Sequence, residues 1–169
     1  MKIKPSDFHN YAFTDYLDNV VRGSLGEYLV ASALGVNDTP ESSWESWDIT
    51  YGNIKIEVKT SSYVQTWKQK KLTTPRFGIP KRLGWQAETN EWGNTKERQA
   101  DIYVFCLFTF KDYIDKESAR SAILETRHWE FYVIPTKDLP TQETIGLWGL
   151  SQLTEPISFE QLPNAIKSF

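Results

Sequence analysis

Apolar and polar residues alternate between positions 47 and 60, and this period of two predicts a β-hairpin. Gly52-Asn53 supplies a two-residue turn at its centre. A tight turn fixes the register, so that Asp48 lies opposite Glu57 and both share one face with Lys59. The opposite face is expected to pack on the core, and it carries Ile49, Tyr51, Ile54, Ile56 and Val58.

Helical spacing of apolar residues predicts a helix over 14–34, with Thr14 as its N-cap and Gly35 as its C-terminal stop. Glu27 lies seven residues, almost two turns, after Val20. We therefore expect this carboxylate at the edge of the apolar face and partly buried. The residues assigned to that face are Leu17, Val20, Val21, Tyr28 and Ala31.

Two further strands follow from apolar runs. Residues 101–110 are almost continuously apolar, which is typical of a strand buried on both faces. Residues 129–134 predict another strand, which Pro135 ends. Residues 36–46 are expected to form a loop, and residues 61–100 to form loops and short elements.

The end of the chain predicts less regular structure. Residues 116–125 fit either a short helix or an exposed loop. Ser158 and Gln161 have the spacing of a capping box and favour a terminal helix, which would pack through Leu162, Ile166 and Phe169. We expect a single α/β domain around a mixed sheet, with a core over 14–135 and an extension over 136–169 that packs on it.

Composition narrows the classes of function. The chain has 169 residues and a net charge of −3, so it is not a basic protein that coats nucleic acid without sequence preference. The single cysteine, Cys106, forms no intrachain disulfide and is expected to fill the core, which fits a reducing cytoplasm. No signal peptide or membrane-spanning run is expected. His9 and His128 lack the spacing of zinc ligands.

Two carboxylates opposite each other in a hairpin repel and destabilise it. A divalent cation between Asp48 and Glu57 removes this repulsion, because Mg²⁺ prefers oxygen ligands and commonly takes one or two carboxylates. Lys59 returns to the same face, where an ammonium can orient a water or stabilise charge on a phosphate. Glu27 is a candidate to bind a second metal or a metal-bound water. The pattern therefore indicates phosphoryl chemistry.

These residues resemble a known family. Trp47-Asp48, an eight-residue gap and Glu57-Val58-Lys59 resemble the PD-(D/E)XK motif of restriction-endonuclease-like nucleases, although Trp47 replaces the leading proline. Residues 23–28, Gly-Ser-Leu-Gly-Glu-Tyr, are similar to the helix before that motif, which supplies an additional acidic residue. The resemblance covers about residues 20–110. Residues 63–67, 98–108 and 129–136 look like an uncharacterised branch of the family.

The resemblance implies a fold and an activity. The implied core has the order α-β-β-β-α-β, with a mixed central sheet flanked by helices. The implied activity is endonucleolytic cleavage of DNA, less often RNA, with Mg²⁺ or Mn²⁺. Asp48, Glu57 and Glu27 are the implied metal ligands, and Lys59 completes the catalytic set. Because one chain has one site, cutting both strands of DNA would require a homodimer or two binding events.

The segment after the motif is basic. Positions 60–87 contain no Asp or Glu, and lysines and arginines neutralise phosphates. The candidate nucleic-acid contacts are Lys68, Lys70, Lys71, Arg76, Lys81 and Arg82. Arg98 is either a phosphate contact or a partner for Asp101, which is expected to cap a strand. The alternative to an enzyme is a non-catalytic module that binds nucleic acid or protein on a nuclease-like scaffold.

Overall fold

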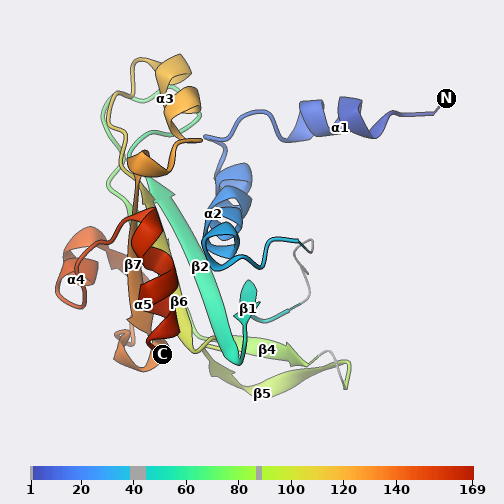
Figure 1. The fold of residues 1–169 in the computed structure, drawn as a ribbon, viewed down its shortest axis with the longest axis vertical. Coiled ribbons are helices and arrows are strands. Elements are labelled where there is room, and N and C mark those ends of the chain that lie inside the picture. The colour runs from blue at the N-terminus through green and yellow to red at the C-terminus, as the bar shows by residue number, and fades with distance from the viewer. Residues whose placement is uncertain (1, 39–44, 87–88) are drawn as a thin grey trace.

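A four-stranded mixed sheet forms the centre of the computed structural model, which describes residues 2–38, 45–86 and 89–169 (Figure 1). Its strands, in spatial order, are β1 (Ile49–Tyr51), β2 (Ile54–Ser62), β6 (Ile102–Phe108) and β7 (Trp129–Pro135). Strand β2 runs antiparallel to β1 and parallel to β6, and β6 runs antiparallel to β7. The predicted α/β class with a mixed sheet is confirmed.

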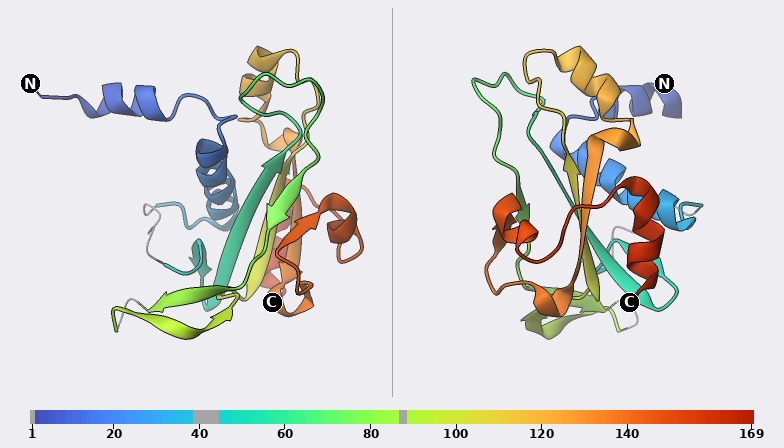
Figure 2. Two further views of the ribbon diagram at one scale, coloured as in Figure 1. Left: turned by 180° about the vertical axis from the view of Figure 1, so that it is seen from behind. Right: turned by 60° about the vertical axis from the view of Figure 1, so that its left-hand side comes forward.

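Helices cover one face of this sheet, and a second, smaller sheet covers the other (Figure 2). The helical face packs against α2 (Asn19–Leu34), α3 (Lys116–Ala122) and α5 (Leu162–Lys167). The opposite face packs against a two-stranded sheet and a short helix, namely β3 (Arg76–Gly78), β8 (Thr144–Gly146) and α4 (Leu147–Ser151). The core therefore has two apolar layers, one on each side of the central sheet.

The hairpin at the start of the sheet has the predicted register. Thr50 pairs with Lys55 and Ile49 pairs with Ile56 across the Gly52-Asn53 turn. Ile49, Ile56 and Val58 are buried on the helical face, with Tyr51 and Ile54 packed against them. The turn dipeptide and the alternation determine this register because both act over a few residues.

Strand β6 is buried at every position, as its apolar run predicts. Its even residues face the helices and its odd residues face the smaller sheet, so both layers of the core contact it. Cys106 is fully buried on the helical side and fills the core as expected. Asp101 caps the neighbouring strand, because its carboxylate accepts a hydrogen bond of 2.8 Å from the Lys55 amide.

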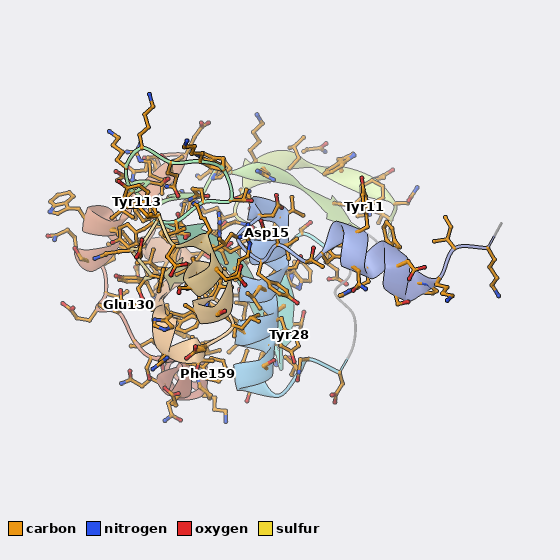
Figure 3. All side chains as sticks on the ribbon, turned by 90° about the horizontal axis from the view of Figure 1, so that it is seen from above. Tyr11, Asp15, Tyr28, Tyr113, Glu130 and Phe159 are labelled. Atoms are coloured by element: carbon orange, nitrogen blue, oxygen red, sulfur yellow. The ribbon has the colours of Figure 1, made fainter. Side chains whose placement is uncertain are left out.

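The first predicted helix begins later than expected. The N-cap of α2 is Asp18, whose carboxylate accepts a 2.9 Å hydrogen bond from the Val20 amide, so the assignment of Thr14 as N-cap is wrong. Gly35 ends the helix with a positive φ of 70°, as predicted. A separate helix, α1 (Pro5–Ala12), precedes α2, extends away from the body of the molecule and buries no residue (Figure 3).

The predicted buried face of α2 is also partly wrong. Val20 and Tyr28 are 71% and 56% exposed. The buried positions of the helix are Arg22, Gly26, Leu29 and Val30. Burial of a charged residue at position 22 rotates the contact face away from the one that hydrophobicity alone selects, and hydrogen bonds to the Leu17 carbonyl and the Asn19 side chain partly satisfy the guanidinium.

The connection between the parallel strands carries short elements that do not belong to the central sheet. Between β2 and β6 the described residues contain no helix, and the short strands there lie outside the central sheet. Two of them, β4 (Arg82–Gln86) and β5 (Glu91–Glu97), form an antiparallel pair of their own. The mixed sheet with flanking helices is present, and the full α-β-β-β-α-β order remains a prediction.

The C-terminal segment forms the predicted capping box, with Ser158 and Gln161 in reciprocal contact. It opens a short 3₁₀ helix over Phe159–Gln161, and two others span Thr126–His128 and Thr136–Asp138. Leu162 and Ile166 are buried as expected, whereas Phe169 is 54% exposed. No helix among the described residues has the length and apolar character needed to cross a membrane.

Candidate active site

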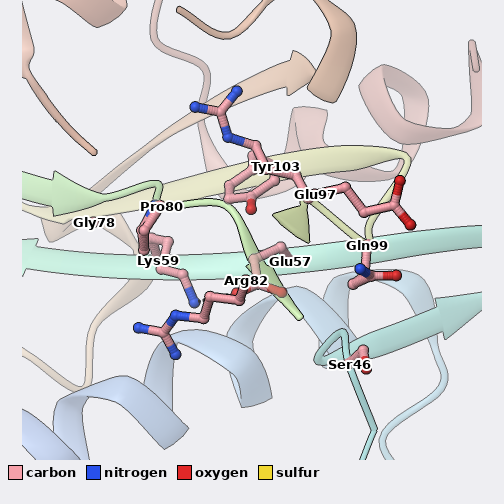
Figure 4. Close-up of a pocket in the computed structure, with 10 residues that line it drawn as sticks. Ser46, Glu57, Lys59, Gly78, Pro80, Arg82, Glu97, Gln99 and Tyr103 are labelled. Carbon is pink, nitrogen blue, oxygen red and sulfur yellow. Dashed lines mark ion pairs between the residues drawn. The ribbon is translucent and has the colours of Figure 1, made fainter. Parts of the chain in front are cut away.

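A pocket of about 210 Å³ lies on the face of the central sheet away from α2, at the base of the β4–β5 hairpin (Figure 4). Strand β2 contributes Glu57 and Lys59, and β6 contributes Tyr103. The remaining lining residues are Ser46, Gly78, Pro80, Arg82, Glu97, Arg98 and Gln99. Two of the predicted catalytic residues therefore share one cavity with one of the predicted nucleic-acid contacts, Arg82.

Glu57 and Lys59 are neighbours on one face of β2 because strand residues two apart point the same way. Their side chains form an ion pair. The carboxylate is 18% exposed and the ammonium-bearing side chain 32% exposed, so both reach solvent through the pocket. In this position Lys59 neutralises the carboxylate, and its side chain still reaches the pocket surface.

Asp48 lies beside the edge of β2, directly before the first residue of β1. The ladder between the two strands finishes at Ile49 and Ile56, and Asp48 continues it only through its amide, 3.0 Å from the Ile56 carbonyl. Its carboxylate then turns back and accepts a 2.6 Å hydrogen bond from the amide of Val58. This bond holds Asp48 beside the strand segment between Glu57 and Lys59.

Two buried side chains show which charges lie close together. The pKa of Tyr103 is raised to about 12, chiefly by burial and in addition by the nearby carboxylates of Glu57 and Asp48. Burial also raises the pKa of Cys106, with Glu27 and Asp48 adding to the effect. Tyr103 and Cys106 lie on opposite faces of β6. The charge of the Asp48 carboxylate, at the strand edge, therefore affects side chains on both faces of the central sheet.

Glu27 approaches from the helical side. Its neighbour Gly26 packs so closely on β2 that an added Cβ would lie 2.0 Å from the Thr60 side chain. Glu27 is half-buried, as predicted, and its charge reaches Cys106. It does not line the pocket that holds Glu57 and Lys59. The four predicted residues thus form a pair on one face, a carboxylate at the edge and a carboxylate on the other face.

The donor set fits a hard divalent cation that keeps much of its water. Among the residues that the structure describes, no group of three or more His, Cys, Asp and Glu side chains is arranged to enclose a metal ion. Mg²⁺ commonly uses one or two carboxylates and completes its shell with water and phosphate oxygens. Asp48 and Glu57 are the two carboxylates that could supply such ligands, and both act electrostatically on Tyr103.

The predicted basic residues are spread over three places. Lys68, Lys70 and Lys71 are exposed in the loop after β2, near α3, where the Tyr113 hydroxyl bonds to the Lys70 carbonyl. Arg76 begins β3 and Lys81 precedes β4, and both are exposed. Only Arg82 lines the pocket.

Several residues of the pocket wall were missed by sequence reasoning. The Ser46 hydroxyl accepts a hydrogen bond from the Trp85 amide at 2.9 Å and donates to the Trp85 carbonyl at 3.1 Å. This pair of bonds attaches the β4–β5 hairpin to the chain at Ser46, two residues before Asp48. Tyr103 enters through the parallel pairing of β2 with β6, which sets it beside Glu57. The apolar run predicts the strand, but no local pattern predicts which strand it joins.

Arg98 has a structural role that neither sequence alternative included. Its guanidinium donates hydrogen bonds to the main-chain carbonyls of Ile79, Leu139, Pro140 and Gln142, at 2.6 to 3.4 Å. These bonds connect the pocket wall to the segment before β8. Most of the N–H donors of Arg98 are therefore used to hold these loops together.

Comparisons with protein-family models, with curated proteins and with solved structures find no match to this chain.

Proposed function

We propose that this protein is a metal-dependent nuclease that hydrolyses phosphodiester bonds in DNA, in a restriction-like or repair-like role. The observation that carries the proposal is the arrangement along β2. Glu57 and Lys59 share a pocket, and Asp48 is bonded to the amide between them. Two carboxylates at one strand edge repel each other, and a cation between them would remove that repulsion.

Each residue has a distinct task in this proposal. Asp48 and Glu57 would hold Mg²⁺ or Mn²⁺, and Glu27 would assist from the helical side. The cation would supply Lewis-acid polarisation of the phosphoryl group. Lys59 holds a positive charge at the pocket surface, where it stabilises negative charge that develops on the phosphate and orients the attacking water. Arg82 lines the same pocket and suits bidentate contact with a phosphate.

The test is plasmid nicking by purified wild-type protein in Mg²⁺, in Mn²⁺ and in EDTA, together with Lys59→Ala, Glu57→Gln and Asp48→Asn. Wild type should nick DNA only with metal, and each variant should lose most of that activity. The matched control is Arg127→Ala, which breaks the exposed ion pair between Arg127 and Glu125 far from the pocket and should nick normally.

Three outcomes would count against the proposal. Nicking that persists in EDTA would exclude metal dependence, and nicking that survives Lys59→Ala would exclude the assigned site. If no protein nicks any DNA but oligonucleotides bind regardless of Mg²⁺ and of Glu57→Gln, the chain is the alternative, a binding module. RNA oligonucleotides in the same assay decide between the two nucleic acids.

Location and assembly complete the proposal. A nuclease with this restriction-like or repair-like role would act in the cytoplasm. Cleavage of both strands by a chain with one pocket would need two copies, so we expect a homodimer on DNA. Light scattering that finds a strict monomer, with and without a DNA duplex, would contradict dimerisation while leaving the nicking activity untouched.

A further inference from the structure

The hydroxyl of Tyr103 occupies a position that the proposed chemistry has not used. Tyr103 as a whole is only 4% exposed, and its ring stacks on Phe105 with the two ring centroids 5.8 Å apart. The side chain nevertheless lines the pocket. Figure 4 shows its oxygen pointing toward Glu57 and Arg82. The ring is therefore fixed in the core while its polar end opens into the cavity.

Strand register explains this placement. Tyr103 pairs with Glu57 and Phe105 pairs with Lys59 across the parallel β2–β6 ladder. Neighbouring strands lie about 4.8 Å apart, and paired residues point to the same face. A ligand that contacts Glu57 and Lys59 is therefore within reach of the Tyr103 hydroxyl.

Two of the cationic side chains in the pocket already have partners within the protein. Lys59 is ion-paired with Glu57, and the guanidinium of Arg98 donates to four main-chain carbonyls. Among the described residues, the Tyr103 hydroxyl makes no hydrogen bond. A tyrosine hydroxyl keeps its proton at physiological pH, because the ordinary pKa of this side chain is about 10. Tyr103 is therefore a neutral donor that is fixed in position and ready for an acceptor.

The pocket limits what that acceptor can be. Its volume of about 210 Å³ is below the 300 to 1,000 Å³ typical of pockets for drug-sized ligands, so a single phosphodiester group fits and a base pair does not. Lys59, Arg82 and Arg98 line it together with Glu57 and Glu97, so cationic side chains are present beside the Tyr103 hydroxyl. An anionic oxygen is the acceptor that this wall favours.

We propose that Tyr103 is a catalytic residue whose hydroxyl donates a hydrogen bond to a non-bridging oxygen of the phosphate bound in the pocket. The inference rests on the proposed nuclease function for the identity of that phosphate as the scissile one. Tyr103 forms no covalent bond and releases no proton. It stabilises the charge that grows on the phosphoryl oxygen as the water attacks.

The test compares Tyr103→Phe with Tyr132→Phe. Each substitution removes one hydroxyl and keeps the ring, and Tyr132 is also buried on the same side of the sheet with a pKa of about 12. Only Tyr103 lines the pocket. Tyr103→Phe should lower the single-turnover cleavage rate on the order of a hundredfold, as loss of one fixed oxyanion donor does. Tyr132→Phe should stay within about twofold of wild type, because its hydroxyl lies outside the pocket.

Binding of inorganic phosphate, measured by calorimetry in EDTA, separates this inference from the nuclease proposal. Tyr103→Phe should weaken phosphate binding about tenfold, since a hydrogen bond to a charged group is lost, and Tyr132→Phe should not. If no cleavage is found but this loss occurs, the nuclease proposal fails and the phosphate site stands. If wild type cleaves and Tyr103→Phe cleaves equally well, or if wild type binds no phosphate, the role of Tyr103 is refuted.

Discussion

Gly26 lies where α2 packs closely against the central sheet. A Cβ atom added there would lie 2.0 Å from Cγ2 of Thr60, whereas one added at Gly23 on the same helix would meet no atom within 4 Å. Optimal contacts between carbon atoms are about 3.5 to 4.0 Å. Gly26→Ala must therefore displace either α2 or the Thr60 side chain, while Gly23→Ala leaves the packing unchanged.

The two substitutions share one favourable contribution and differ in one cost. Replacing a helical glycine by alanine adds about 0.5 to 1 kcal/mol to the free energy of unfolding. At Gly23 this gain stands alone. At Gly26 overpacking costs about 1 to 3 kcal/mol and outweighs it. We expect the variants to differ by about 2 kcal/mol, which corresponds to melting temperatures about 4 to 8 °C apart in a chain of this size.

Urea denaturation of four variants tests this reasoning. Thr60→Ser removes Cγ2, after which the nearest neighbours of the added Cβ are Cβ of Thr60 at 3.5 Å and Cβ of Cys106 at 3.7 Å. The double variant Gly26→Ala/Thr60→Ser should therefore be more stable than Gly26→Ala, although Thr60→Ser alone loses a methyl group. Equal stability of Gly26→Ala and Gly23→Ala, or no rescue by Thr60→Ser, would refute the close contact.

Three further predictions concern polar contacts. Burial opposes ionisation of Asp15, but hydrogen bonds, the strongest from Arg120, outweigh it and hold the carboxyl pKa below its ordinary value. Stability from a lowered pKa is present above the unfolded-state pKa of about 3.9 and is lost as the pH falls through the folded-state pKa. Asp15→Asn should therefore lower the free energy of unfolding at pH 7 and have a smaller effect in acid. Urea melts in which wild type and Asp15→Asn differ as much in acid as at pH 7 would contradict this. Ser46→Ala should speed hydrogen exchange at the Trp85 amide and cost about 1 kcal/mol, and unchanged exchange would mean that the two Ser46 bonds do not hold the hairpin. Glu125→Gln breaks an exposed ion pair and should change the free energy of unfolding by less than about 1 kcal/mol in thermal melts.

The features predicted from sequence are those determined over a few residues. The hairpin register, the Gly35 stop and the capping box at Ser158 each depend on a turn or cap whose partners lie close in the chain. The buried β6 strand follows from its apolar composition. For the same reason, the alternation along the hairpin is sufficient to place Glu57 and Lys59 on one face.

The features that sequence reasoning missed depend on distant partners. The buried guanidinium of Arg22 turns α2 away from its most apolar face, and the hydrogen bonds that permit this burial are invisible to a hydrophobic pattern. The pocket wall requires the pairing of β2 with β6 and the attachment of β4 to Ser46. No local signal encodes either contact, so Tyr103 was not among the predicted site residues.

The parallel pairing of β2 with β6 also has a kinetic consequence. The hairpin that carries Glu57 closes through neighbouring residues, whereas the ladder that adds Tyr103 must join Ile56 to Ile102 after the intervening chain has been gathered. Contacts between residues distant in sequence form slowly, because the entropy of loop closure is lost before the contacts form. The acidic half of the pocket can therefore form early in folding, and the opposite wall forms only near the end. A chain in a partly folded state would carry its carboxylates without the wall that opposes them, so the complete pocket is a property of the native state alone.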